Sequence, residues 1–243
     1  MKNQKSAIEM NVKEQAAYID QSVLKPEFTQ DDIRKYIQEG IDFGCATVCV
    51  NPAALPIAQE LCAGTDTKIC VVCDFPFGLS TTEAKVMQAE TYCSKYDVYE
   101  LDIVANYGWI RSGMWDSVRE DIAAVCECCH KYGVAVKTIF ETDALTLDEI
   151  LRATEEAIAA GTDFVKTSTG FYTGSVAYSR DGKCVGAEPN LIAAMLEKAD
   201  GRCKVKGSGS IRTREHFLQL IDMGIDRMGV GYRSTPVVLG VGK

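Results

Sequence analysis

Two lysines stand in apolar segments where charged residues are unusual. Lys166 follows Phe164 and Val165, and Lys206 follows Val205. An amine with an ordinary pKa of ~10.4 is almost wholly protonated at neutral pH and cannot attack a carbonyl. A second ammonium group nearby and removal from water both disfavour the charged form, and this is how proteins prepare a lysine to form a Schiff base. If the two lysines lie on neighbouring strands, they predict covalent chemistry on an aldehyde or ketone.

Carboxylates and a further lysine occupy similar apolar segments. Glu100 and Asp102 lie within ELDIV, and Lys137 lies within VKTIFE. Strand residues two apart share a face, so Glu100 and Asp102 point the same way. Any one of these charges could belong to a structural ion pair or face outward, but neighbouring predicted strands each carry one. Because an imine needs a group that removes and returns protons, we predict that Asp102 transfers them.

The elements that position these residues alternate along the chain. Short β-branched runs predict strands at residues 18–22, 47–51, 68–74, 98–105, 135–141, 163–167, 203–207 and 227–230. Helical patterns lie between them at residues 29–39, 82–95, 115–132, 147–160, 189–199 and 214–223. This rhythm predicts an α/β fold, a (β/α)8 TIM barrel, whose chemistry gathers at the carboxyl ends of the strands. The alternative is an open doubly wound sheet, and the first strand lacks the GxGxxG that would favour it.

A repeated tripeptide supports the same rhythm. Gly40, Gly161 and Gly224 each follow a helical pattern, and each is followed two residues later by an aspartate and then by a predicted strand. Glycine commonly ends a helix in the left-handed conformation. We therefore expect all three glycines to be helix stops.

The composition fits one large globular domain. The chain has 243 residues, of which 47% are hydrophobic and 25% charged, and α/β barrels of this length are often undivided. We expect a single domain over residues 1–243, with residues 1–17 as an N-terminal helical extension. The formal net charge of -8 gives no general reason for nucleic acid or an anionic membrane to bind. Residues 1–13 do not resemble a signal peptide and apolar runs are short, so we expect a cytoplasmic protein.

Cysteines and histidines do not predict a disulfide framework or a metal centre. The 11 cysteines are scattered within apolar segments, which is typical of reduced, buried thiols. Cys70 and Cys73 have CxxC spacing, but they lie in a predicted strand rather than at a helix start. The chain has only two histidines, His130 and His216, both on predicted helices. A possible cluster on one helix would spread over different faces; its members are Cys126, Cys128, Cys129 and His130.

Five segments, in this order, resemble signature segments of the deoxyribose-phosphate aldolase family. They are IDQSVLKP at residues 19–26, ELDIVAN at 100–106, VKTIFET at 136–142, FVKTSTGF at 164–171 and VKGSGSIR at 205–212. The resemblance implies a class I aldolase on a TIM barrel that uses no cofactor. Such an enzyme cleaves 2-deoxy-D-ribose 5-phosphate reversibly to acetaldehyde and D-glyceraldehyde 3-phosphate. It further implies that Lys166 forms the Schiff base, Lys206 perturbs it and Asp102 moves protons.

The same resemblance implies the residues that bind substrate, with backbone N–H groups of Gly-rich loops holding the phosphate. They are Asp20, Cys49, Lys137, Thr169, Gly170, Gly209, Ser210, Gly231, Tyr232 and Arg233. The phosphate loops depart from the family pattern. The usual Gly-Gly reads Gly209-Ser210, and the Ser-rich turn reads GVGYRS at residues 229–234, so Tyr232 is expected to narrow the pocket. Arg233 either binds an anion bidentately or is a solvated loop charge.

Two features have no fixed interpretation. Lys204 is either a third interior lysine or an exposed residue at the strand entrance. Residues 175–186 form either a small hairpin over the mouth, as Asp181-Gly182 would favour, or a plain surface insertion.

Three other functions compete with this one. An aldolase of the same family could act on a different, unphosphorylated or carboxylated, sugar or aldehyde. A metal-dependent aldolase would require more ligands than the two histidines provide. A non-catalytic barrel could bind a phosphosugar, although the lysines and Asp102 argue against it.

The expected partners are small-molecule aldehyde and sugar phosphate substrates, and the family suggests a homodimer.

Overall fold

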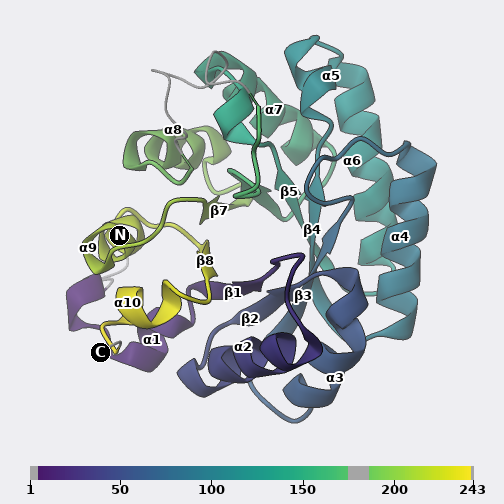
Figure 1. Ribbon diagram of the computed structural model, residues 1–243. Helices are drawn as coiled ribbons and strands as arrows, with labels where there is room; N and C mark the ends of the chain where they lie inside the picture. Colours follow the sequence, from purple (N-terminus) through teal and green to yellow (C-terminus); the bar gives the residue numbers. More distant parts are fainter. Residues whose placement is uncertain (1–4, 175–185, 242–243) are drawn as a thin grey trace.

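The structure is a computed structural model that describes residues 5–174 and 186–241. Eight parallel strands close into a barrel in which each strand pairs with the next along the chain and β8 pairs with β1 (Figure 1). The strands are β1 Ile19–Val23, β2 Thr47–Val50, β3 Lys68–Cys73, β4 Val98–Val104, β5 Ala135–Ile139, β6 Phe164–Lys166, β7 Lys204–Ser208 and β8 Arg227–Gly231. The predicted barrel is confirmed, and every strand was expected within two residues of its observed ends.

Helices surround the barrel on its outside (Figure 1). The longer ones are α2 Gln30–Phe43, α3 Leu55–Cys62, α4 Thr82–Lys95, α6 Trp115–His130, α7 Leu147–Ala159, α8 Pro189–Ala199 and α9 Arg214–Asp222. The short ones are η1 Ala7–Glu9, α1 Val12–Ala16, η2 Pro52–Ala54, α5 Tyr107–Arg111, η3 Thr142–Ala144 and α10 Thr235–Leu239. The sequence did not predict α3, because it is short and carries a proline in its first turn.

One of the three predicted helix stops is wrong. Helix α2 runs through Gly40 and ends at Gly44, which has a φ of 76°. At Gly40 a Cβ atom would lie 2.8 Å from Cγ1 of Val48, so this glycine allows α2 to approach β2 closely. Gly161 and Gly224 have φ values of 88° and 89° directly after α7 and α9, as expected of helix stops.

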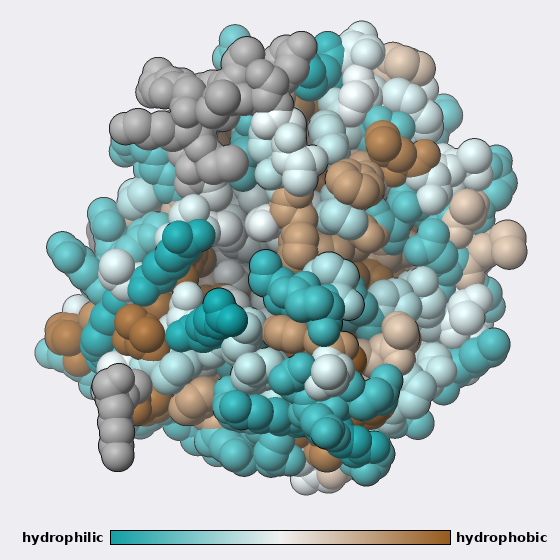
Figure 2. All heavy atoms as spheres, viewed as in Figure 1, coloured by the Kyte–Doolittle hydropathy of each residue, from teal (hydrophilic) through white to brown (hydrophobic). Residues whose placement is uncertain are grey.

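Two hydrophobic regions are separated by the barrel wall. Leu101 and Ile103 of β4 belong to the large core between strands and helices, whereas Asp102 between them faces the barrel interior. A small apolar cluster lies inside the barrel instead; it consists of Leu24, Cys49, Cys70 and Val72. On the face seen in Figure 2, hydrophilic side chains cover much of the outer surface and hydrophobic ones gather near the middle. The alternation along β4 therefore delivers a carboxylate to the interior.

The sequence left open the position of Lys204 and the structure of residues 175–186. Residues 175–185, which hold most of the expected hairpin, lie outside them. Lys204 is exposed at the start of β7, so the strand-entrance alternative is the correct one. Within residues 5–174 and 186–241, no helix has the length and apolar character needed to cross a membrane.

Candidate active site

Lys166 and Lys206 meet at one carboxylate oxygen inside the barrel. They are register partners on β6 and β7, and both are buried. Nζ of Lys166 lies 2.6 Å from Oδ2 of Asp102, and Nζ of Lys206 lies 2.7 Å from the same atom. The prediction that the two lysines occupy neighbouring strands is confirmed, whereas their shared contact with one Asp102 oxygen was not predicted. The roles assigned to them remain predictions.

A second charged layer lies beside this oxygen. Nζ of Lys137 lies 3.0 Å from Oδ1 of Asp102 and bonds Glu100 as well. Asp20 of β1 lies 2.5 Å from Lys206 and 3.5 Å from Lys137. All of these side chains are buried. Three lysines and three carboxylates from β1, β4, β5, β6 and β7 therefore form one connected network.

Arg227 also belongs to this network, although the sequence did not predict it as a site residue. Its guanidinium Nη1 lies 2.5 Å from Asp20 and 3.0 Å from Glu100, and its Nη2 donates to Glu100 at 3.1 Å. It stands at the first position of β8, in register with Lys206. A strand-opening arginine in register with an interior lysine was the available signal. Arg227 balances the carboxylates on the side away from Lys166.

The network fixes the charge of its central members. Burial alone would raise the pKa of Asp102, but Lys137, Lys166 and Lys206 outweigh it and hold that pKa well below its ordinary value. Burial alone would lower the pKa of Lys206, yet Asp102 and Asp20 raise it above the ordinary value. Lys206 is therefore a permanent cation and Asp102 a permanent anion at neutral pH.

Two thiols lie beneath these groups, on β2 and β3. Cys49 and Cys70 are register partners, and Sγ of Cys70 donates to Oδ1 of Asp102 at 3.1 Å. Burial raises the pKa of Cys70, and a hydrogen bond with Cys70 lowers that of Cys49. The donor atoms of Cys49, Cys70 and Asp102 lie within 4.8 Å of one another, a spacing that could hold a metal ion. Lys137, 3.4 Å from Cys70, already places a cation beside them.

The other cysteines lie as the sequence predicted. Cys70 faces the barrel interior, whereas Sγ of Cys73 points to the backbone of α4, so the CxxC pair is split across the barrel wall. Ten cysteines among the described residues are free thiols, and nine of them are buried. His130 at the end of α6 lies 2.8 Å from the Asp163 carboxylate.

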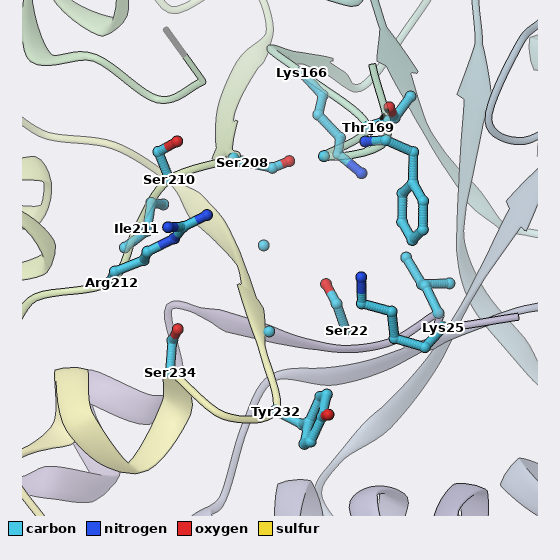
Figure 3. A pocket seen from close by; sticks show the side chains of 16 residues that line it. Ser22, Lys25, Lys166, Thr169, Ser208, Ser210, Ile211, Arg212, Tyr232 and Ser234 are labelled. Carbon is cyan, nitrogen blue, oxygen red and sulfur yellow. Dashed lines mark hydrogen bonds between the residues drawn. The ribbon is translucent and has the colours of Figure 1, made fainter. Parts of the chain in front are cut away.

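A cavity of about 230 Å³ opens above Lys166 (Figure 3). Six of the expected binding residues line it: Thr169, Gly170, Gly209, Ser210, Gly231 and Tyr232. The lining also includes Lys25 and Arg212, which the sequence analysis did not single out, with Ser22 and Ser234. In Figure 3 the side chains of Lys25, Arg212 and Lys166 approach the open centre from different sides. The cavity thus combines one buried amine with two further cations.

Tyr232 lines the cavity as expected, whereas Arg233 does not line it and is an exposed loop residue. The Tyr232 ring packs on Tyr36 of α2, with ring centroids 3.9 Å apart, and edge-on against Phe28 at 5.1 Å. The ring therefore forms part of the cavity wall and is anchored to α2. The Arg233 guanidinium lies 5.3 Å from the Tyr232 ring centroid, and Arg233 is not among the described residues that line the cavity. Asp20, Cys49 and Lys137 lie deeper in the barrel.

The glycine of the β7 loop is required by its backbone. Gly209 has a φ of 90°, and Ser210 after it also has a positive φ of 60°. A Cβ at Gly209 would lie 3.0 Å from Cα of Gly186, because the two loops nearly touch. Ser210 stands where the family usually has a second glycine. It adopts the left-handed conformation that a glycine would adopt there, and it keeps the backbone N–H of that position.

Comparison with known proteins gives a consistent result. Residues 15–234 match the DeoC/LacD family of aldolases. A deoxyribose-phosphate aldolase of Desulfitobacterium hafniense is 40% identical over 215 residues, which cover 88% of this chain and 93% of that protein. A crystal structure of a putative deoxyribose-phosphate aldolase from Coccidioides immitis has a TM-score of 0.82 at 31% identity, covering 96% of this chain and 85% of the other. A tetrameric deoxyribose phosphate aldolase from Aeropyrum pernix has a TM-score of 0.81 at 26% identity, with 95% and 91% covered.

Proposed function

Since the chain belongs to the DeoC/LacD family of aldolases, we propose that it is a class I aldolase that cleaves 2-deoxy-D-ribose 5-phosphate to acetaldehyde and D-glyceraldehyde 3-phosphate. The observation that carries this proposal is the position of Lys166. Its amine reaches the cavity while sharing Oδ2 of Asp102 with the permanent cation Lys206. A buried amine that opens onto a cavity beside a second lysine is the arrangement used by lysines that form Schiff bases.

The reaction would begin at the aldehyde carbon of the open-chain sugar. Lys166 attacks this carbon to give a carbinolamine, which loses water to form a protonated imine. The bond between the second and third carbons then breaks as the hydroxyl on the third carbon loses its proton. The electron pair of the broken carbon–carbon bond moves into the imine and leaves an enamine of acetaldehyde on Lys166. Glyceraldehyde 3-phosphate departs with its new aldehyde group. Protonation of the enamine carbon and hydrolysis release acetaldehyde and restore the amine.

Asp102 is suited to the proton transfers of this sequence. With three ammonium groups around it, its carboxylate is a weak base in the resting enzyme. When Lys166 becomes part of a neutral enamine, one of those positive charges disappears, and Asp102 becomes more basic. The carboxylate therefore gains affinity for the hydroxyl proton as the carbon–carbon bond breaks and the protonated imine turns into the enamine.

The far end of the cavity is suited to the phosphate. Gly170, Gly209 and Ser210 contribute backbone to its wall, and Arg212 contributes a guanidinium. Guanidinium and backbone N–H groups are the usual ligands of a phosphate ester. These residues support a phosphorylated substrate over an unphosphorylated one.

Reduction with borohydride tests the proposal. The protein is incubated with deoxyribose 5-phosphate or acetaldehyde, reduced, digested and mapped by mass spectrometry, with Lys166→Arg as the variant and Lys204→Arg as the matched control. A reduced adduct on the Lys166 peptide, absent in Lys166→Arg and retained in Lys204→Arg, is expected. An adduct on another lysine, or turnover without an adduct, contradicts it. Equal kcat/KM for deoxyribose and its 5-phosphate would favour the unphosphorylated alternative, and binding without turnover would favour the phosphosugar-binding barrel.

Several broader properties belong to the same proposal. We propose that the partners are small aldehydes and sugar phosphates, that the enzyme is cytoplasmic, and that residues 1–243 form one domain with residues 1–17 as its helical extension. A homodimer is also proposed. The Aeropyrum pernix protein is described as tetrameric, and light scattering coupled to size exclusion distinguishes these states.

A further inference from the structure

Glu141 is a buried carboxyl that the reaction sequence above does not use. It lies two residues after the end of β5, and only 1% of its surface is exposed. Its backbone has a φ of 59°, in the left-handed region that a non-glycine residue rarely adopts. An acidic residue that is both buried and held in an uncommon conformation is typical of a functional constraint.

The carboxylate of Glu141 holds the turn that follows the Schiff-base strand. It accepts hydrogen bonds from the backbone N–H of Thr169, at 3.2 Å, and from the Thr169 hydroxyl. Oγ1 of Thr169 in turn accepts a hydrogen bond from the backbone N–H of Phe171, at 2.9 Å. One carboxylate therefore fixes the conformation of residues 169–171, including Gly170, whose φ is 81°.

This turn is part of the cavity wall. Thr169, Gly170 and Phe171 all line the cavity, together with Gly209 and Ser210 of the β7 loop. The connection after β5 is already joined to the segment after Lys166. Thr142 N–H donates to the Thr167 carbonyl at 3.1 Å, and the hydroxyls of Thr142 and Ser168 lie 3.0 Å apart. The hydrogen bonds from Thr169 to Glu141 extend this contact between the two connections as far as the turn.

We propose that Glu141 is a positioning residue for substrate specificity, whose ionised carboxylate holds the turn of residues 169–171 in the conformation that receives the phosphate end of the substrate. This inference rests on the proposed function, because it assigns that turn to the phosphate. Glu141 does not line the cavity among the described residues, so it acts through Thr169 and not by direct contact with the sugar. A phosphorylated substrate depends on it, and an unphosphorylated one does not.

The charges around Glu141 make this support sensitive to pH. Burial raises the pKa of Glu141 to about 7, the hydrogen bonds from Thr169 oppose that rise, Asp143 adds to it and Lys166 opposes it. Tyr107 of α5 also faces this carboxyl, and its own pKa is raised by burial and then by Glu141. Protonation removes one acceptor from the carboxyl and weakens its hold on Thr169. The preference for a phosphorylated substrate should therefore weaken as the pH falls below 7.

Steady-state kinetics with deoxyribose 5-phosphate and deoxyribose test the inference, using Glu141→Gln and, as control, Glu120→Gln on the exposed face of α6. Loss of a hydrogen bond to a charged group predicts that Glu141→Gln raises KM for the phosphorylated sugar by roughly 10-fold or more. Its kcat/KM for deoxyribose should stay within about 3-fold, the scatter of a neutral change. The variant should also lose the part of the pH dependence between pH 6 and 8 that is not due to the phosphate group itself.

Thr169→Val removes the hydroxyl partner without deleting the carboxylate and guards against a folding defect in Glu141→Gln. It should reproduce the KM effect, and the double variant should be little worse than either single one. Equal losses on both sugars, or no loss on either, would overturn the inference. Borohydride trapping of acetaldehyde on Lys166 is measured in parallel. No adduct in the unaltered enzyme refutes the proposed function, whereas an adduct with an unchanged sugar preference refutes only the role of Glu141.

Discussion

The two ends of the barrel interior contain the same kinds of residue and use them differently. Towards the amino ends of the strands, Lys137 and Arg227 are enclosed by Asp20, Glu100 and Asp102 and have no access to the cavity among the described residues. At the carboxyl ends, Lys166 bonds one carboxylate oxygen and also lines the cavity. Burial and ion pairing are therefore shared by both kinds of lysine and do not separate Lys166 from Lys137. The distinguishing feature is a buried amine with one face open to the site.

The strongest test of this contrast is removal of the open lysine. Lys166→Ala should lower kcat by roughly 10⁴-fold or more, since no covalent intermediate can form. Lys204→Ala, which removes an exposed lysine at the other end of β7, should change it by less than about 3-fold. Acetaldehyde release measured with a coupled dehydrogenase reports both. Appreciable turnover in Lys166→Ala would show that the open lysine is not the nucleophile.

Lys137, the lysine enclosed by carboxylates, should contribute to the stability of the fold. Lys137→Ala leaves Glu100 and Asp102 with an uncompensated buried charge, so it should reduce the free energy of unfolding by about 3–5 kcal/mol. Arg34→Ala breaks an exposed pair with Glu60 of 2.9 Å and should cost less than about 1 kcal/mol. Urea denaturation followed by circular dichroism compares the two. Similar losses in both variants would mean that the interior network contributes little to stability.

The two ends should also respond oppositely to pH. Lys137, Lys206 and Arg227 outweigh burial and lower the pKa of Asp20, so its contribution to stability is present above the ordinary value of 3.8 and is lost as the pH falls below it. The pKa of Glu141 is raised from 4.5 to about 7, so its contribution is complete below 4.5 and is lost as the pH rises through 7. Relative to the unaltered chain, Glu141→Gln should gain on the order of 2 kcal/mol between pH 5 and pH 8. Parallel urea-derived stability curves for the two proteins would contradict this.

The smallest effect distinguishes two arginines near the mouth. Arg212 lines the cavity, whereas Arg233 lies over the Tyr232 ring. Arg212→Ala should raise KM for deoxyribose 5-phosphate by roughly 10- to 100-fold through loss of a charge-assisted hydrogen bond. Arg233→Ala should change it by less than about 3-fold. The reverse order would mean that the loop after β8, not the loop after β7, supplies the phosphate ligand.

The sequence predicted what depends on local pattern. Alternation along β4 correctly turned Asp102 inward, and the adjacency of β6 and β7 correctly brought Lys166 to Lys206. The sequence did not predict contacts between side chains from strands on different sides of the barrel. Arg227 meets Glu100 from β8 and β4, and which interior residues share a level depends on the stagger of the closed sheet, which no single segment encodes.

Loops and close packing account for the other differences. Lys25 and Arg212 lie in connections without periodicity, so their approach to the cavity could not be read from spacing. Gly40 was predicted to end a helix, because the sequence shows a glycine before an aspartate but not the Val48 side chain that requires its small size. Tyr232 lines the cavity as expected, but the Tyr36 ring that it packs on lies about 200 residues earlier in the chain and could not be identified from the sequence.

The sharing of a single Asp102 oxygen by two amines has a consequence for the whole catalytic cycle. If Lys166 forms the Schiff base as proposed, the aspartate does not become an isolated anion in the barrel interior when that lysine loses its charge, because Lys206 stays bound to it. No counter-ion therefore has to enter the barrel to balance Asp102.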